Sequence, residues 1–175
     1  MTIIKNDYLK IGSDAATLKL EAFINLSCPG SKAFYEVYKE SLISYVEAEK
    51  LQIILKLYDK PREELLHGTL IHLGLHYDRP EETLKIIADL LETQETWLHS
   101  NDAEIKNLLV TKYGLPQEEI EANTEISLAF TLEAIQRNVK IVPNIFINGN
   151  QKQFTFQNFR AEVVQFVEEE LLAAK

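Results

Sequence analysis

Apolar residues recur along this chain with two different spacings, and the change between them divides it into three parts. In the first part, residues 18–24 and 51–57 are short apolar runs, which are typical of buried strands. Between them, residues 31–50 repeat apolar positions every three or four residues, as one face of a helix does. A strand, a helix and a strand in this order predict a right-handed parallel β-α-β unit.

The middle of the chain lacks strand-like alternation and predicts helices only. Pro80 suits the first turn of one helix, Asn101 the N-cap of another, and Gly114 the position just after a helix end. The four predicted helices span residues 63–76, 80–95, 103–113 and 117–138, with 123 as an alternative start for the last. We expect Trp97, which follows the second of these helices, to lie in the core.

After residue 139 the strand pattern returns. Residues 141–147 predict an apolar strand, and Asn148-Gly149 predicts a tight hairpin turn before a returning strand at 151–154. A final helix is predicted over 158–174. Residues 2–4 predict a short edge strand or extended arm near the N-terminus. The expected fold class is therefore α/β, with residues 1–60 and 139–175 as one domain and 61–138 as an inserted helical domain.

The charge and cysteine content narrow the range of partners. The 175 residues carry 18 basic and 27 acidic side chains, a net charge of −9, and the basic residues form no run. We therefore expect neither nucleic acid nor an anionic membrane surface as a partner. No stretch approaches the roughly 18 apolar residues that span a bilayer, and the N-terminus does not resemble a secretory signal. One cysteine excludes an intrachain disulfide and suits a reducing compartment, so we expect a cytoplasmic protein.

Cys28 is the principal candidate for chemistry. It follows the predicted strand at 18–24 and precedes Pro29, which suits the first turn of a helix. A thiol at a helix N-terminus lies beside unpaired N–H groups and the positive end of the helix dipole, and both favour thiolate over thiol. The alternative is an inert cysteine packed as a small hydrophobic residue.

Pro143 is the second unusual position, because it opens a predicted strand and removes a ladder hydrogen bond. A cis peptide bond near a functional loop would explain it, and so would a cis-proline with a purely structural role.

Taken together and in order, these features resemble the DsbA-type branch of the thioredoxin superfamily, a bacterial type. The matching pieces are INLSCPGS (24–31), the helical insertion with PEETLKIIADLLETQETW (80–97) and YGL (113–115), and VPNIFING (142–149). The resemblance covers nearly the whole chain and implies a thioredoxin-like α/β fold with an inserted all-helical domain.

The resemblance also implies roles for individual residues. Cys28 matches the nucleophilic cysteine, and Val142 and Pro143 match the cis-proline loop that flanks the thiol and binds an extended peptide. Pro29 and Gly30 match the dipeptide that tunes redox potential. These implied roles make Pro29, Gly30, Val142 and Pro143 candidate substrate-binding residues.

Ser31 is the departure from the family pattern. Oxidoreductases of the family carry a second, resolving cysteine at this position, so the chain resembles a single-thiol variant. Cys28 would attack a disulfide and hold a mixed disulfide until an outside thiol releases it. We expect the Ser31 hydroxyl to hydrogen-bond the Cys28 thiolate, and Gly30 to leave space for a substrate. Glu21 is the candidate for a buried acid near the thiol, but its odd separation from Cys28 turns it to the opposite face.

Two other functions stay open at the sequence level. One is a redox-inactive binding protein in which Ser31 marks lost catalysis. The other is an enzyme similar to the kappa class of glutathione transferases, which shares this architecture and uses a serine, here Ser27 or Ser31. The expected partner is a thiol or disulfide, either peptide or of low molecular weight, and a homodimer is possible if the insertion exposes an apolar face.

Three histidines share one predicted helix. His72 and His76 are four residues apart, which is a zinc-like spacing, and Glu64 with His67 has the spacing of carboxylate-bridged metal sites. Such sites need a second copy of the motif, and the chain has no clear one. We therefore interpret these histidines as a solvated or groove-lining face and expect no metal or cofactor.

Overall fold

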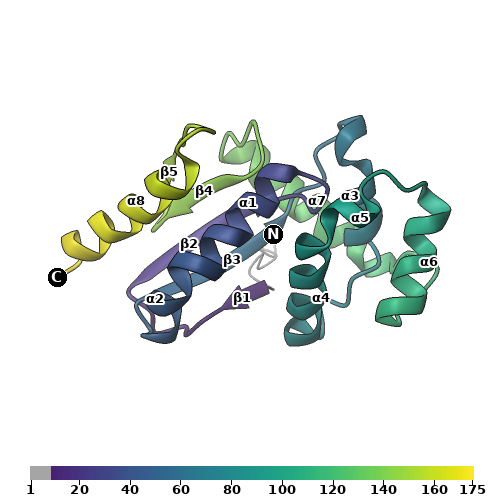
Figure 1. Cartoon of the computed structure of the whole chain (residues 1–175), viewed down its shortest axis with the longest axis horizontal. Coiled ribbons are helices and arrows are strands. Elements are labelled where there is room, and N and C mark those ends of the chain that lie inside the picture. Colours follow the sequence, from purple (N-terminus) through teal and green to yellow (C-terminus); the bar gives the residue numbers. More distant parts are fainter. Residues whose placement is uncertain (1–8) are drawn as a thin grey trace.

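The computed structural model describes residues 9–175, and the strand predicted at residues 2–4 lies outside them. A five-stranded sheet in the order β1-β3-β2-β4-β5 forms the centre of the molecule (Figure 1). Its strands are β1 (Leu9–Ile11), β2 (Leu18–Ile24), β3 (Leu51–Leu57), β4 (Asn144–Ile147) and β5 (Asn150–Lys152). β2 and β3 are parallel, as predicted, and all other neighbours are antiparallel.

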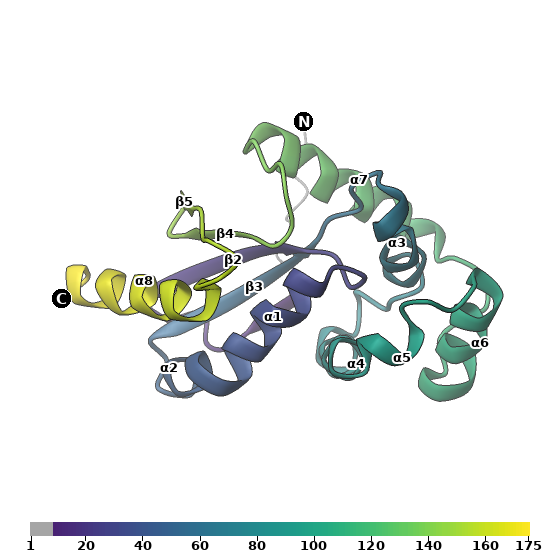
Figure 2. The same ribbon diagram turned by 45° about the horizontal axis from the view of Figure 1, so that its top comes forward.

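Helices cover both faces of this sheet (Figure 2). α1 and α8 lie on one face and α7 on the other, while α3 to α6 lie beyond one end of the strands (Figures 1 and 2). The helices are α1 (Pro29–Val37), α2 (Ile43–Glu47), α3 (Leu66–His72), α4 (Pro80–Glu92), α5 (Gln94–Trp97), α6 (Asp102–Tyr113), α7 (Glu121–Gln136) and α8 (Phe159–Ala173). The thioredoxin-like α/β class expected from the sequence is thereby confirmed.

Alternation along β2 divides its side chains between the two faces. Its even-numbered apolar residues enter the main core with α1 and α8, whereas Phe23 joins a smaller cluster with Tyr58, Phe146 and Ala134 of α7. The main core continues without a break into the helical segment, where it includes Trp97 and Ile105. The boundaries of the two predicted domains stay a prediction, since the two parts share one core.

The prediction of one continuous helix over residues 31–50 is wrong in its start and in its continuity. α1 begins at Pro29, and a π-helical turn at Tyr38–Leu42 separates it from α2. The buried residues explain the turn: Val37 and Leu42 are five apart, and a wider turn keeps both on the core side.

The helix predicted over residues 63–76 is also shorter than expected. A 3₁₀ turn at Glu63–Leu65 precedes α3, and α3 ends at His72, so His76 is not on this helix. The Asn123 amide of α7 donates to the carbonyls of Leu73 and Leu75 at 2.9 and 2.7 Å, which satisfies the backbone groups that the helix end leaves free.

Other helix ends follow the local signals more closely. Asn101 and Glu104 form a reciprocal capping box at the start of α6, and Gly114 has a left-handed φ of 64° after its end. The helix predicted over 80–95 is divided at Thr93, whose hydroxyl donates to the Asp89 carbonyl at 2.7 Å. Trp97 is 2 % exposed, which confirms its place in the core.

The hairpin β4–β5 begins later than predicted. Residues 141–143 lie outside the strand, which starts at Asn144. Asn148 and Gly149 have φ values of 46° and 83°, as a two-residue hairpin turn requires. The loop at 141–143 consequently lies outside the paired strands of the sheet and beside the start of α1.

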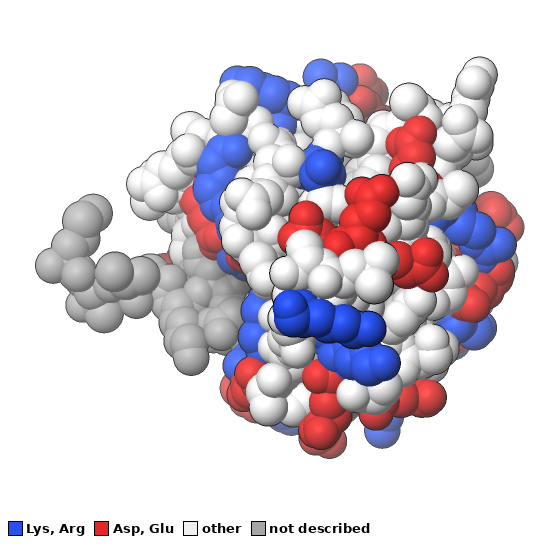
Figure 3. Space-filling model, turned by 90° about the vertical axis from the view of Figure 1, so that its left-hand side faces the viewer, with Lys and Arg blue, Asp and Glu red and all other residues white. Residues whose placement is uncertain are grey.

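Among residues 9–175, no helix is both long and apolar enough to cross a membrane. On the end of the molecule that carries α8, acidic and basic side chains are interspersed (Figure 3).

Candidate functional site at the start of helix α1

Cys28 caps the N-terminus of α1 in an extended conformation, with φ −83° and ψ 123°. Its side chain is partly buried, and Sγ donates to the Val142 carbonyl oxygen at 3.4 Å. The Val142–Pro143 peptide bond is cis. The fold thus brings together two segments that are 114 residues apart.

Gly30 allows this close approach. A Cβ atom at Gly30 would lie 2.7 Å from Cδ of Pro143 and 3.5 Å from Sγ of Cys28. The space at Gly30, which was expected to receive a substrate, is therefore occupied by the Pro143 ring. The absence of a side chain serves contact between α1 and the loop at 141–143.

We expect Gly30→Ala to lower the free energy of unfolding by about 1–3 kcal/mol, because the new methyl group must push the Pro143 ring away. Urea unfolding measures the change. The control is Gly74→Ala, whose Cβ would meet nothing nearer than 3.5 Å. Equal stabilities for the two variants would contradict the assigned close contact.

Ser31 makes a different contact from the one expected. It is fully buried, and its Oγ accepts a hydrogen bond from the Asn25 backbone N–H at 3.1 Å. No hydrogen bond between Ser31 and Cys28 Sγ is seen in the described part of the chain. Ser31 therefore ties the first turn of α1 to the end of β2. The neighbouring Ser27 is 2 % exposed, and its hydroxyl has no partner among residues 9–175.

The contact to Val142 has a chemical consequence. A thiol donates to a carbonyl, whereas a thiolate has no proton to donate. The N–H groups of Ser31 and Lys32, in the first turn of α1, are paired, because they donate to the Cys28 carbonyl oxygen at 3.0 and 3.3 Å. To act as a nucleophile, Cys28 must lose its proton, and Sγ must move off the Val142 oxygen.

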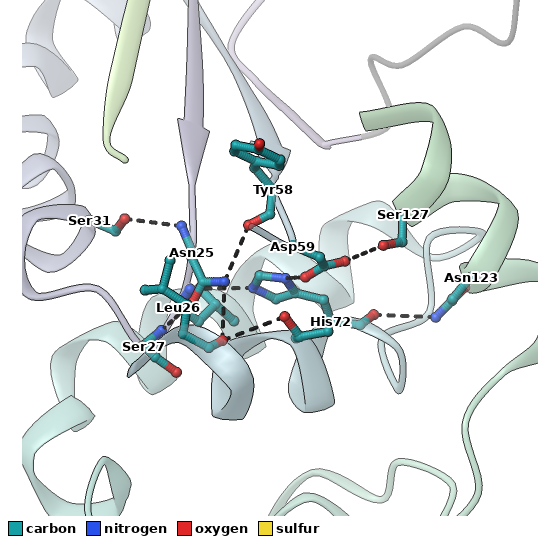
Figure 4. Close-up of polar contacts among 11 residues, drawn as sticks. Asn25, Leu26, Ser27, Ser31, Tyr58, Asp59, His72, Asn123 and Ser127 are labelled. Carbon is teal, nitrogen blue, oxygen red and sulfur yellow. Dashed lines mark hydrogen bonds and ion pairs between the residues drawn. The ribbon is translucent and has the colours of Figure 1, made fainter. Parts of the chain in front are cut away.

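The segment before Cys28 is held by polar groups that the sequence analysis missed (Figure 4). The Asn25 amide donates to the carbonyls of Tyr58 and Leu65 at 3.2 and 3.4 Å, and its Oδ1 accepts from the Ser27 N–H at 2.9 Å. The sequence gives no sign of the two amide contacts, because Tyr58 directly follows β3 and Leu65 ends the 3₁₀ turn before α3.

Gln94 of α5 fixes the same segment from another side. Its Nε2 donates to the Leu26 carbonyl at 2.7 Å and to the Cys28 carbonyl at 3.1 Å. Gln94 is 2 % exposed. Because its two acceptors lie more than sixty residues away in sequence, spacing gives no sign of this role.

Glu21 lies in a charged network between the sheet and α7. Arg137 donates to both of its oxygens at 2.7 and 2.9 Å, and Lys56 donates to Oε2 at 2.6 Å. Glu133 accepts from the same two cations, and the Arg137 guanidinium lies 3.8 Å from the centre of the Phe146 ring. Burial raises the pKa of Glu21, but hydrogen bonds and charge from Arg137 and Lys56 outweigh burial and lower it.

The three histidines considered as metal ligands have separate partners. His67 contacts the Leu98 carbonyl at 3.1 Å, His72 contacts Asp59 at 2.6 Å, and His76 lies 3.8 Å from Asp78. Within residues 9–175, no three His, Cys, Asp or Glu side chains form a group that could hold a metal ion.

Solved structures of similar fold include proteins from several bacteria. A conserved protein of unknown function from Enterococcus faecalis V583 is 28 % identical, with a TM-score of 0.78 over 91 % of this chain and 89 % of that one. A protein-disulfide isomerase from Novosphingobium aromaticivorans is 19 % identical, with a TM-score of 0.64 over 91 % and 96 % of the two chains. Oxidised BdbD from Bacillus subtilis is 14 % identical, with a TM-score of 0.66 over 93 % and 92 %.

The comparison with curated proteins gave no match. A family model described as thioredoxin matches residues 5–165, which include Cys28, the helical segment and the loop at 141–143. The chain therefore belongs to the thioredoxin family.

Proposed function

We propose that this protein is a thiol–disulfide oxidoreductase of the DsbA-like, single-thiol type, with Cys28 as its nucleophile. The observation that carries the proposal is the position of Cys28 Sγ, partly buried at the start of α1 and 3.4 Å from the Val142 carbonyl. Membership of the thioredoxin family supports it, and so does the similarity in fold to a protein named a protein-disulfide isomerase.

The proposed reaction consists of two successive thiol–disulfide exchanges. The Cys28 thiolate attacks one sulfur of a disulfide, a new S–S bond forms at Cys28, and the other sulfur leaves as a thiolate. With Ser31 in place of a second cysteine, an outside thiol must attack the mixed disulfide. That attack regenerates the Cys28 thiolate and leaves the outside thiol joined to the substrate sulfur. A reducing compartment such as the cytoplasm would supply that thiol.

The test is mass spectrometry of the purified protein after exposure to glutathione disulfide and to a disulfide-containing peptide. We expect an adduct at Cys28 that an added thiol removes, and no adduct in Cys28→Ser. A folded protein that forms no adduct at Cys28 with either disulfide, while the same chain unfolded in urea does, would contradict a catalytic role.

A second candidate, a binding protein without redox activity, is favoured by the hydrogen bond from Cys28 to Val142. This bond needs only a neutral donor, and a serine hydroxyl can replace the thiol in it. Ligand affinity that is unchanged in Cys28→Ser, together with slow disulfide exchange in the parent protein, would favour this function.

A further inference from the structure

A buried histidine supports the backbone just before Cys28. The Leu26 N–H donates to Nε2 of His72 at 3.3 Å, and His72 is 1 % exposed (Figure 4). An amide N–H can only donate, so Nε2 must be the acceptor and carries no proton. The remaining ring proton therefore lies on Nδ1, which is 2.6 Å from Oδ1 of Asp59.

Asp59 is suited to hold this tautomer. Its side chain is 6 % exposed, and its other oxygen accepts from the Ser127 hydroxyl of α7. Hydrogen bonds from the Ser127 hydroxyl and from Nδ1–H of His72 both favour the ionised carboxylate of Asp59. Asp59 thus accepts a hydrogen bond from Nδ1–H, which leaves the lone pair of Nε2 available to accept from the Leu26 N–H.

The two hydrogen bonds connect three separate parts of the fold. Asp59 follows β3, His72 ends α3, and Leu26 lies two residues before Cys28. Without an acceptor, the Leu26 N–H would be a buried, unpaired donor, which is unfavourable enough to displace the backbone. A displaced backbone would carry Cys28 Sγ away from the Val142 oxygen.

We propose that His72, oriented by Asp59, is a positioning residue that holds the segment before Cys28 and thereby keeps the thiol on the Val142 carbonyl. Its importance for activity rests on the function proposed above. The positioning itself does not, because it concerns only the geometry of the thiol.

Two substitutions at one site separate the two hydrogen bonds. An asparagine amide reaches about as far as Nδ1, so His72→Asn keeps a donor to Asp59 and removes the acceptor for Leu26. A glutamine side chain reaches about as far as Nε2, so His72→Gln keeps an acceptor for Leu26. The readout is the rate at which iodoacetamide alkylates Cys28, which needs an accessible thiol and no disulfide chemistry.

We expect His72→Asn to be alkylated about fivefold faster than the parent protein, since loss of the acceptor frees Sγ. His72→Gln should stay within about twofold of the parent. Equal rates for the two variants, with both folded by circular dichroism, would overturn the proposal.

Nitrogen-15 NMR of the parent protein provides a test that needs no variant. We expect the proton on Nδ1 of His72 and a Leu26 amide coupled to Nε2 through the hydrogen bond. A proton on Nε2 would overturn the proposal. If instead alkylation behaves as expected and no mixed disulfide forms at Cys28, the positioning role stands and the proposed oxidoreductase function fails.

Discussion

Gly68→Ala should lower the free energy of unfolding by about 3 kcal/mol. A Cβ at Gly68 would lie 1.9 Å from Oδ1 of Asn25, far inside contact distance. The Asn25 side chain is fully buried and cannot rotate away without breaking its bonds to Tyr58 and Ser27. Urea unfolding measures the loss.

A double-mutant cycle tests whether this contact is the cause. In Asn25→Ala the amide is absent, so adding Gly68→Ala should then lower stability by well under 1 kcal/mol, with strong non-additivity. Gly74→Ala, whose Cβ would meet nothing nearer than 3.5 Å, is the matched control near the end of α3. Additive losses in the cycle would show that Gly68 is needed for some other reason.

Glu21→Gln should lower stability by about 3 kcal/mol near neutral pH, because it leaves Lys56 and Arg137 with one carboxylate between them in place of two. The Lys56 side chain is 6 % exposed and that of Glu21 17 %, so water screens the loss only weakly. Glu95→Gln, which removes an 82 % exposed partner of Lys32, is the control and should change stability by less than about 1 kcal/mol.

The same substitution should change the response to acid. The pKa of Glu21 is lowered from its usual 4.5 in the folded protein, so its contribution is present above that value and is lost as pH falls through the lowered pKa. The stability difference between parent and Glu21→Gln should therefore shrink below about pH 4.5. A difference that is constant from neutral to acid pH would rule out an ionised Glu21 as its source.

Strands and many helix ends of this fold could be predicted because their causes are local. The apolar runs of β2 and β3 have the bounds that the sequence predicted, and Asn101 and Gly114 mark both ends of α6. Where the prediction failed, a distant partner was responsible. α3 ends at His72 where Asn123 caps it from α7, about fifty residues away.

The residues of the candidate site were likewise only partly predictable from the sequence. Cys28 and Pro143 were visible in the sequence because each is unusual for its position, and the structure brings their segments together. Asn25 and Gln94 were not visible, since an asparagine or a glutamine in a helix or loop is usually at the surface. Each became a candidate only when the fold showed that it is buried against the backbone before Cys28. His72 stood out in the sequence for its spacing from His76, but its buried contact with the Leu26 N–H comes from a part of the chain 46 residues away and could not be predicted.

The order of the strands has a consequence for synthesis of the protein. β2 lies at the centre of the sheet, yet its neighbour β4 is among the last elements of the chain, and His72 and Gln94 also follow Cys28 by many residues. Because chains emerge from the ribosome N-terminus first, Cys28 is exposed to the translation environment before the groups that hold it have been made. During that interval its reactivity is that of an ordinary cysteine in an unfolded peptide, and the properties of the finished site arise only once the loop at 141–143 and β4 have been made and have packed beside it.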